Sequence, residues 1–93
     1  MPDSIVRPRL NPKARLRLDR QTGRYLLLFP EAGLDLNHAG SDILRRCTGE
    51  HTTEDIISEL AAIHAGTPAA QIARDVRAFV GTLADRGLIQ DAA

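Results

Sequence analysis

The stretch GLDLNHAGSDILRRC (residues 33–47) decides the fold of this chain, because its hydrophobic period changes partway through. Leu34 and Leu36 alternate with Asp35, which predicts a strand with one buried face. After Asn37 the apolar residues recur every four positions, as on one face of a helix. The short amide side chain of Asn37 can accept from a free backbone N–H of the first turn, so it is the expected N-cap. The stretch therefore predicts the junction between a small sheet and a group of helices.

Two further strands are expected before this junction. Residues 13–19 alternate between apolar and charged side chains, and residues 19–24 have the composition of a turn. Residues 25–29 are apolar on both faces, so we expect both faces of this strand to be covered. Together with residues 34–36 they predict a three-stranded antiparallel sheet. The side chains expected to point inward from the first strand are Ala14, Leu16 and Leu18.

Three helices are expected after the junction. The first covers about residues 38–47, and the third carries the clearest apolar stripe of the chain. The predicted fold is α+β, a three-stranded antiparallel sheet followed by a three-helix bundle, similar to a winged helix. Residues 1–12 are expected to form an extended arm, and residues 13–90 a single domain. Gly49 and Gly66 are expected to end the first and second helices. Thr52 and Asp55 are expected to form a capping box at the start of the second helix. The third helix is expected to begin with Thr67 as its N-cap and Pro68 as its first residue.

Composition restricts the class of protein. The chain has 93 residues, 43% hydrophobic and 26% charged, which suits one globular domain. No apolar run approaches the roughly 20 residues that a membrane span needs, and no secretory signal is visible. The single cysteine excludes an intramolecular disulfide. We therefore expect a cytoplasmic protein that does not contact a membrane.

Charge is distributed unevenly along the chain. Residues 1–24 carry seven basic and two acidic groups, a net charge of +5, and residues 25–93 carry five basic and ten acidic groups, a net charge of −5. The basic groups at the N-terminal end are nearly all arginines, which pair well with carboxylates or phosphates.

No catalytic or metal-binding constellation is evident. Cys47 and His51 are the only pair with a familiar spacing, but Cys47 falls on the apolar face of the first helix, where a buried cysteine acts as a small hydrophobe. Structural zinc needs four ligands, which the scattered histidines do not supply. The candidate acid–base groups, Asp42, Glu54, Asp55 and Glu59, fit a solvated helix face. We expect no catalytic residue, no metal and no cofactor.

Three binding functions were compared. A winged helix that binds nucleic acid needs a basic recognition helix, but the cations of the third helix are nearly balanced by carboxylates. No nucleic-acid partner is therefore expected, although a contact through the basic first hairpin stays an alternative. The third strand leaves an open sheet edge, which could pair with an extended peptide, or could be covered by the same chain or by a second copy through exchange of the arm or a strand. The residues of the chain favour neither peptide binding nor a covered edge.

The chain resembles the PqqD family, the D proteins of pyrroloquinoline quinone (PQQ) biosynthesis. The resemblance covers about residues 8–89, and it departs from the family pattern at Thr48 and His64. It rests on an ordered set of residues rather than one motif: Pro8, Ala14-Arg15-Leu16-Arg17 with Asp19, Leu27-Leu28-Phe29-Pro30-Glu31, Leu34, Leu36-Asn37, Ile43-Leu44, Cys47-Thr48-Gly49, Asp75-Val76, Phe79 and Gly87-Leu88-Ile89.

The resemblance implies a peptide chaperone and not an enzyme. Such a protein binds the precursor peptide PqqA and presents it to the radical S-adenosylmethionine enzyme PqqE, which carries its own iron–sulfur clusters. In this fold a bound leader peptide adds to the third strand and rests against the third helix. Carried over to this sequence, the implied peptide-binding residues are Leu34, Asp35, Leu36 and Asn37 on the strand, and Arg74, Val76, Arg77 and Val80 on the helix.

Overall fold

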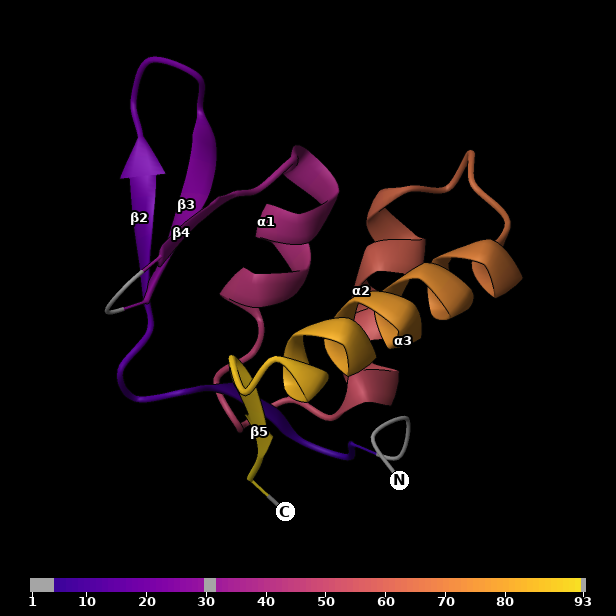
Figure 1. Cartoon of the computed structure of the whole chain (residues 1–93). Helices are drawn as coiled ribbons and strands as arrows, with labels where there is room; N and C mark the ends of the chain where they lie inside the picture. The colour runs from indigo at the N-terminus through magenta and orange to yellow at the C-terminus, as the bar shows by residue number, and fades with distance from the viewer. Residues whose placement is uncertain (1–4, 30–31, 93) are drawn as a thin grey trace.

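Figure 1 shows the chain as a sheet on one side of the molecule, α2 and α3 on the other, and α1 between them. This computed structural model describes residues 5–29 and 32–92, without the side chains of residues 32–35. Within those residues the fold is α+β, with three helices and antiparallel strand pairs. The elements are β1 (Pro8–Leu10), β2 (Arg15–Asp19), β3 (Arg24–Phe29), β4 (Ala32–Asp35), α1 (His38–Arg45), α2 (Thr53–Ile63), α3 (Ala69–Asp85) and β5 (Ile89–Asp91).

The strands form two sheets, whereas the sequence predicted one. Strands β2, β3 and β4 pair antiparallel in that order, with Leu16 opposite Leu27 and Leu27 opposite Leu34. Gly23 closes the β2–β3 hairpin at φ 73°, a positive value that glycine adopts without strain. Strands β1 and β5 form a separate two-stranded sheet, in which Arg9 lies opposite Gln90.

The second sheet ties the N-terminal arm to the end of the chain. The Asp91 carboxylate accepts hydrogen bonds from the backbone N–H groups of Val6 and Arg7, at 3.1 and 3.0 Å. The N–H of Thr53, at the start of α2, donates to the carbonyl oxygen of Val6 at 2.8 Å. From Ile5 onward the arm is therefore held on both sides by the rest of the chain.

The predicted N-caps of α1 and α2 are confirmed. The Asn37 side chain accepts from the N–H of Gly40 at 2.7 Å. Thr52 and Asp55 form a reciprocal capping box, in which each side chain accepts from the backbone N–H of the other at 3.0 Å. These hydrogen bonds hold the pKa of Asp55 below its usual value, because they favour the charged carboxylate.

Four other predicted helix ends are wrong. Helix α1 ends at Arg45, so that Cys47 lies outside it, because the N–H groups of the next two residues close tighter turns onto Ile43 and Leu44. Gly49 therefore is not a helix cap. Its φ of 86° serves the loop between α1 and α2, where a Cβ would lie 3.2 Å from that of Ala92. Helix α2 ends before Gly66, at Ile63, with His64 as C-cap. The N-cap of α3 is Pro68 and not Thr67, and no side chain caps this helix.

One face of the β2–β3–β4 sheet packs on the helices. Leu27 of β3 is 1% exposed and joins the core formed with the buried residues of all three helices. The other face is only partly covered, because Leu26 and Leu28 are half-buried and lie outside this core, so the prediction of a strand covered on both faces is wrong. Leu18 is also not buried as predicted; it is 46% exposed, near the end of a hairpin that extends beyond α1 (Figure 1). Among the described residues, none of the helices is long and apolar enough to cross a membrane.

Candidate functional site

Strand β4 presents an open backbone edge. Among the described strands it pairs with β3 alone. The N–H of Leu36 donates to the carbonyl oxygen of Tyr25 at 3.1 Å, so the backbone of Leu36 faces β3. Because successive residues of a strand direct their backbone groups to opposite sides, Leu34 also faces β3, and Gly33 and Asp35 face the open edge. The N–H and C=O groups of these two residues are those that an added strand would bond.

Helix α3 approaches the end of β4 across the first turn of α1. The ring of Phe79, on α3, lies against Gly40, where an added Cβ would be 3.2 Å from two ring carbons. The same position would be 3.2 Å from the side-chain oxygen of Asn37, the residue two places beyond β4. Glycine at position 40 thus lets the half-buried Phe79 ring lie beside the point at which the chain leaves the sheet.

The contacts of α3 show which of its flanks faces the first turn of α1, next to the end of β4. Its centre is buried at Ile72, Val76, Val80 and Leu83. Asp75 shares a small hollow with Ala39 and Asp42 of α1, and Phe79 follows one turn later on the same flank. Thr82 and Arg86 continue that flank at helical spacing. The flank of α3 that faces the first turn of α1 therefore carries an aromatic ring and a carboxylate, and a hydroxyl and a guanidinium follow on the same flank.

The structure distributes the eight predicted site residues over three environments. Leu34 and Asp35 lie in β4, where only their backbone is described, and the exposed Asn37 follows with its side-chain oxygen occupied by the N-cap bond. Leu36, Val76 and Val80 are 3%, 1% and 3% exposed and belong to the core. Arg77 pairs with Glu54 of α2, on the flank opposite Phe79, and Arg74 is exposed between the two flanks, away from the core.

The predicted strand residues therefore lie in the strand that carries the open edge or directly after it, whereas two of the predicted helix residues lie in the core and Arg77 pairs with α2. The sequence showed the apolar stripe of α3 without showing which flank beside it meets α1 and β4. In the sequence, Phe79 fits the apolar stripe of this helix, and Asp75 is one of the carboxylates that balance its arginines. The signal that could have found this flank is Gly40 in the first turn of α1, because a buried helical glycine marks a close approach by another element.

A small hollow of about 80 Å³ continues this flank between the three helices. Its floor is formed by buried aliphatic side chains, and the carboxylates of Asp42 and Asp75 lie at its rim. The lining residues are Ala39, Asp42 and Ile43 of α1, Leu60 and His64 of the α2 end, and Ile72, Asp75 and Val76 of α3.

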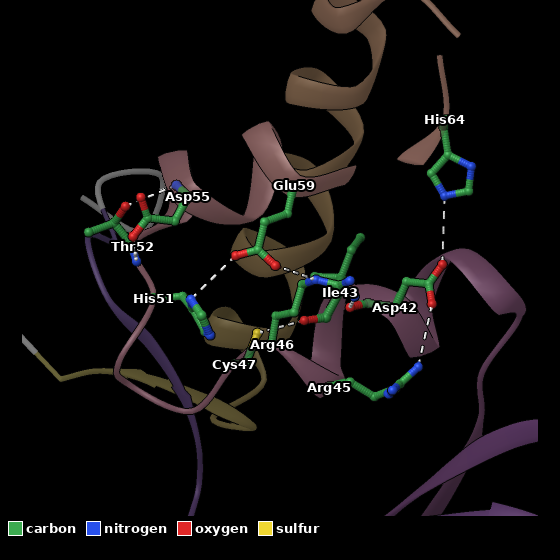
Figure 2. A network of polar contacts seen from close by, with 10 residues as sticks. All are labelled: Asp42, Ile43, Arg45, Arg46, Cys47, His51, Thr52, Asp55, Glu59 and His64. Atoms are coloured by element: carbon green, nitrogen blue, oxygen red, sulfur yellow. Dashed lines mark hydrogen bonds and ion pairs between the residues drawn. The ribbon is translucent and has the colours of Figure 1, made fainter. Parts of the chain in front are cut away.

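A polar network joins α1 to α2 (Figure 2). The carboxylate of Glu59 accepts from Nε of Arg46 at 3.1 Å and lies 3.4 Å from Nδ1 of His51. Asp42 lies 3.7 Å from Nε2 of His64 and 4.0 Å from a guanidinium nitrogen of Arg45. All these side chains are partly exposed, so each pair contributes about 0–1 kcal/mol to stability. The network joins α1 and its following loop to α2.

Cys47 is a buried structural residue, as the sequence predicted. Its side chain is 3% exposed, and its thiol donates to the carbonyl oxygen of Ile43 at 3.3 Å (Figure 2). Burial raises the pKa of Cys47 to about 12, so the reactive thiolate is not formed at neutral pH. Within residues 5–29 and 32–92, histidine, cysteine and acidic side chains do not gather in groups of three or more that could hold a metal ion.

Comparison with solved structures defines the class of protein. The PqqD truncation of Methylobacterium extorquens PqqCD matches with a TM-score of 0.77 at 26% identity, covering 96% of this chain and 97% of that one. It is described as a functional, stand-alone recognition element for ribosomally synthesized and post-translationally modified peptides (RiPPs). TbiB1 in complex with the TbiA(beta) leader peptide also reaches 0.77, at 20% identity over 91% of this chain and 98% of that one, which shows a shared fold alone. The fold is that of a RiPP recognition element.

Comparison with sequences defines the family. The model of the PqqD family, described as Coenzyme PQQ synthesis protein D, matches residues 24–89. A PqqA binding protein of Rhodopseudomonas palustris strain CGA009 is 37% identical over 86 residues, 92% of this chain and 83% of the relative. A PqqA binding protein of Methylococcus capsulatus is 29% identical over 90 residues, 97% of this chain and 91% of the relative. The chain belongs to the PqqD family, as the sequence resemblance indicated.

Proposed function

We propose that this chain is a peptide chaperone of PQQ biosynthesis, which binds the precursor peptide PqqA and presents it to PqqE without catalysing a reaction itself. The observation that carries the proposal is the open edge of β4, where the backbone groups of Gly33 and Asp35 have no strand partner among the described strands. Membership of the PqqD family and the description of its relatives as PqqA binding proteins support the same function.

The peptide would add to β4 as a fourth strand. Its backbone would bond to Gly33 and Asp35, and alternate side chains would point to the face of the sheet that packs on the helices. At the α1 end of β4 the peptide would meet Phe79, whose half-buried ring offers apolar contact area. Asp75 and Arg86 would add charge selectivity on the same flank of α3. Leu36, Val76 and Val80 would act indirectly, by holding β4 and α3 in place from within the core.

A titration with synthetic PqqA tests this proposal. Isothermal calorimetry should show saturable binding of one peptide per chain, and amide chemical shifts should move most for Gly33, Asp35 and the residues around Phe79. A parallel titration with duplex DNA tests the winged-helix alternative, whose affinity would fall steeply with salt. Binding of DNA without binding of PqqA would refute the proposed function. Changes in amide shifts confined to β2 would move the peptide site to the other edge of the sheet.

A further inference from the structure

Strand β2 is the second open edge of the β2–β3–β4 sheet. Among the described strands it pairs with β3 alone. Since Tyr25 directs its backbone toward β4, its neighbours Arg24 and Leu26 direct theirs toward β2, where they lie opposite Asp19 and Arg17. The backbone groups of Leu16 and Leu18, which alternate with those residues, therefore face outward. A broad open hollow of about 790 Å³ follows this edge, lined by residues 16–21 and Leu26.

The side chains along this edge are cationic and apolar together. Arg15, Arg17 and Arg20 are exposed, and none of them forms an ion pair or side-chain hydrogen bond with any described residue. Leu18 is 46% exposed, and Leu26 is half-buried opposite Arg17. We refer to Arg15, Arg17, Leu18 and Arg20 as the β2 surface.

In the helical part of the molecule, three of the five arginines lie beside a carboxylate. They are Arg45, Arg46 and Arg77, and the carboxylates are those of Asp42, Glu59 and Glu54. The chain holds twelve acidic residues in all, yet none of those described is placed against Arg15, Arg17 or Arg20. Guanidinium groups left unpaired on the strand of the exposed Leu18, with the half-buried Leu26 opposite Arg17, fit a partner that brings its own carboxylates and some apolar surface.

We propose that the β2 surface docks an acidic surface of the enzyme that modifies the peptide, while the peptide itself lies on β4. This inference rests on the proposed function, because a chaperone that presents a peptide needs a second surface for the enzyme. Only β3 separates β2 from β4, so the two edges lie about 10 Å apart at the usual strand spacing. An enzyme docked on β2 therefore reaches the peptide without competing for its strand.

The test uses one charge-reversed variant and one matched control. Arg15→Glu/Arg17→Glu changes the β2 surface at exposed side chains that the core does not use. Arg74→Glu is the control, since Arg74 is also exposed and has no ion-pair partner among the described residues, but lies on α3. Affinity for PqqE and for PqqA is measured separately for each variant by calorimetry at two salt concentrations, and thermal melts followed by circular dichroism verify the fold.

The expected result separates the two affinities. Arg15→Glu/Arg17→Glu should bind PqqE at least tenfold more weakly and with a smaller salt dependence, and should bind PqqA within twofold of the parent. Arg74→Glu should match the parent in both. Unchanged PqqE affinity in the double variant would overturn the inference, and so would an equal loss in the control.

Other occupants of the β2 surface give distinct outcomes. A parent dimer that Arg15→Glu/Arg17→Glu converts to a monomer would overturn the inference in favour of a second copy of the chain. Loss of PqqA affinity alone would make β2 the peptide edge, and binding of duplex DNA in place of PqqE would assign the arginines to phosphates. If the parent binds PqqE but not PqqA, the proposed peptide function fails while the docking surface stands.

Discussion

Replacement of Asp35 by proline tests the β4 edge with little risk to the fold. Proline lacks the backbone N–H, and at position 35 this group faces outward, so the β3–β4 ladder keeps its hydrogen bonds. Proline also favours an extended conformation in the residue before it, which Leu34 already has. The substitution therefore removes one hydrogen-bond donor from the edge that the peptide would use.

The expected loss of affinity follows from the value of one hydrogen bond. Loss of one hydrogen bond, with a net contribution of about 0.5–1.5 kcal/mol, should raise the dissociation constant for PqqA roughly 2- to 13-fold. Disturbance of the neighbouring bond at Gly33 would raise the loss to about a hundredfold. Asp35→Ala keeps the N–H and should bind within twofold of the parent. Leu34→Pro, which removes a donor that faces β3, should instead lower the melting temperature.

Calorimetric titration with PqqA provides the affinities, and thermal unfolding followed by circular dichroism provides the fold check. If Asp35→Pro stays folded and binds PqqA as tightly as the parent, the peptide does not add to β4, and the reasoning from backbone direction is refuted. Equal losses in Asp35→Ala and Asp35→Pro would also refute it, because the effect would then come from the carboxylate.

Three further predictions concern other parts of the molecule. Phe79→Ala should weaken PqqA binding at least fivefold in the same titration, whereas Arg74→Glu and Arg77→Glu, which lie away from that flank, should leave it within twofold; the reverse ranking would place the peptide on the other side of α3. Cys47 should resist iodoacetamide at pH 8 in the folded protein and react after unfolding in urea, as followed by mass spectrometry. Burial raises the pKa of the Cys47 thiol from 9.0 to about 12, so between these values the thiol loses its proton only in the unfolded state. Relative to Cys47→Ala, the free energy of unfolding should therefore be unaffected below pH 9 and should fall by about 1.4 kcal/mol per pH unit above it, up to the folded-state pKa. Self-association by exchange of the arm or a strand stays a prediction, which light scattering over a concentration series can decide. The hydrogen bonds that hold Val6 and Arg7 within one chain oppose exchange of the arm, so a dimer would have to form by pairing of a β edge between copies.

Local features of the fold were predictable from the sequence. The N-cap Asn37 and the capping box of Thr52 and Asp55 depend on side chains and backbone groups within three residues of each other, so their chemistry is visible in a short stretch. The change of hydrophobic period near residue 37 located the junction between β4 and α1. The buried stripe of α3 was likewise visible, because each of its residues is placed by the helical repeat alone.

Features that depend on distant parts of the chain were not predictable in the same way. Residues 8–10 show no strand period, and their partner β5 lies about eighty positions later, where Asp91 also binds the arm. Leu18 fits an alternating pattern, yet it is 46% exposed, in the outer strand of a hairpin that extends beyond α1 (Figure 1). In both cases the outcome depends on an element that is distant in the sequence. The spacing of nearby residues does not show where that element lies.

The candidate site shows the same division. By itself the sequence determined that a short strand with an open edge precedes α1, and its resemblance to the PqqD family indicated what that edge would bind. Only the tertiary structure decided which flank of α3 faces α1 and the end of β4. An apolar stripe identifies the buried side of a helix, but it does not show which of the two flanks beside that stripe faces another element. The contact between Phe79 and Gly40 fixes the rotation of α3: Phe79 and Asp75 lie on the flank that faces α1, whereas Arg77 pairs with Glu54 of α2 on the other flank.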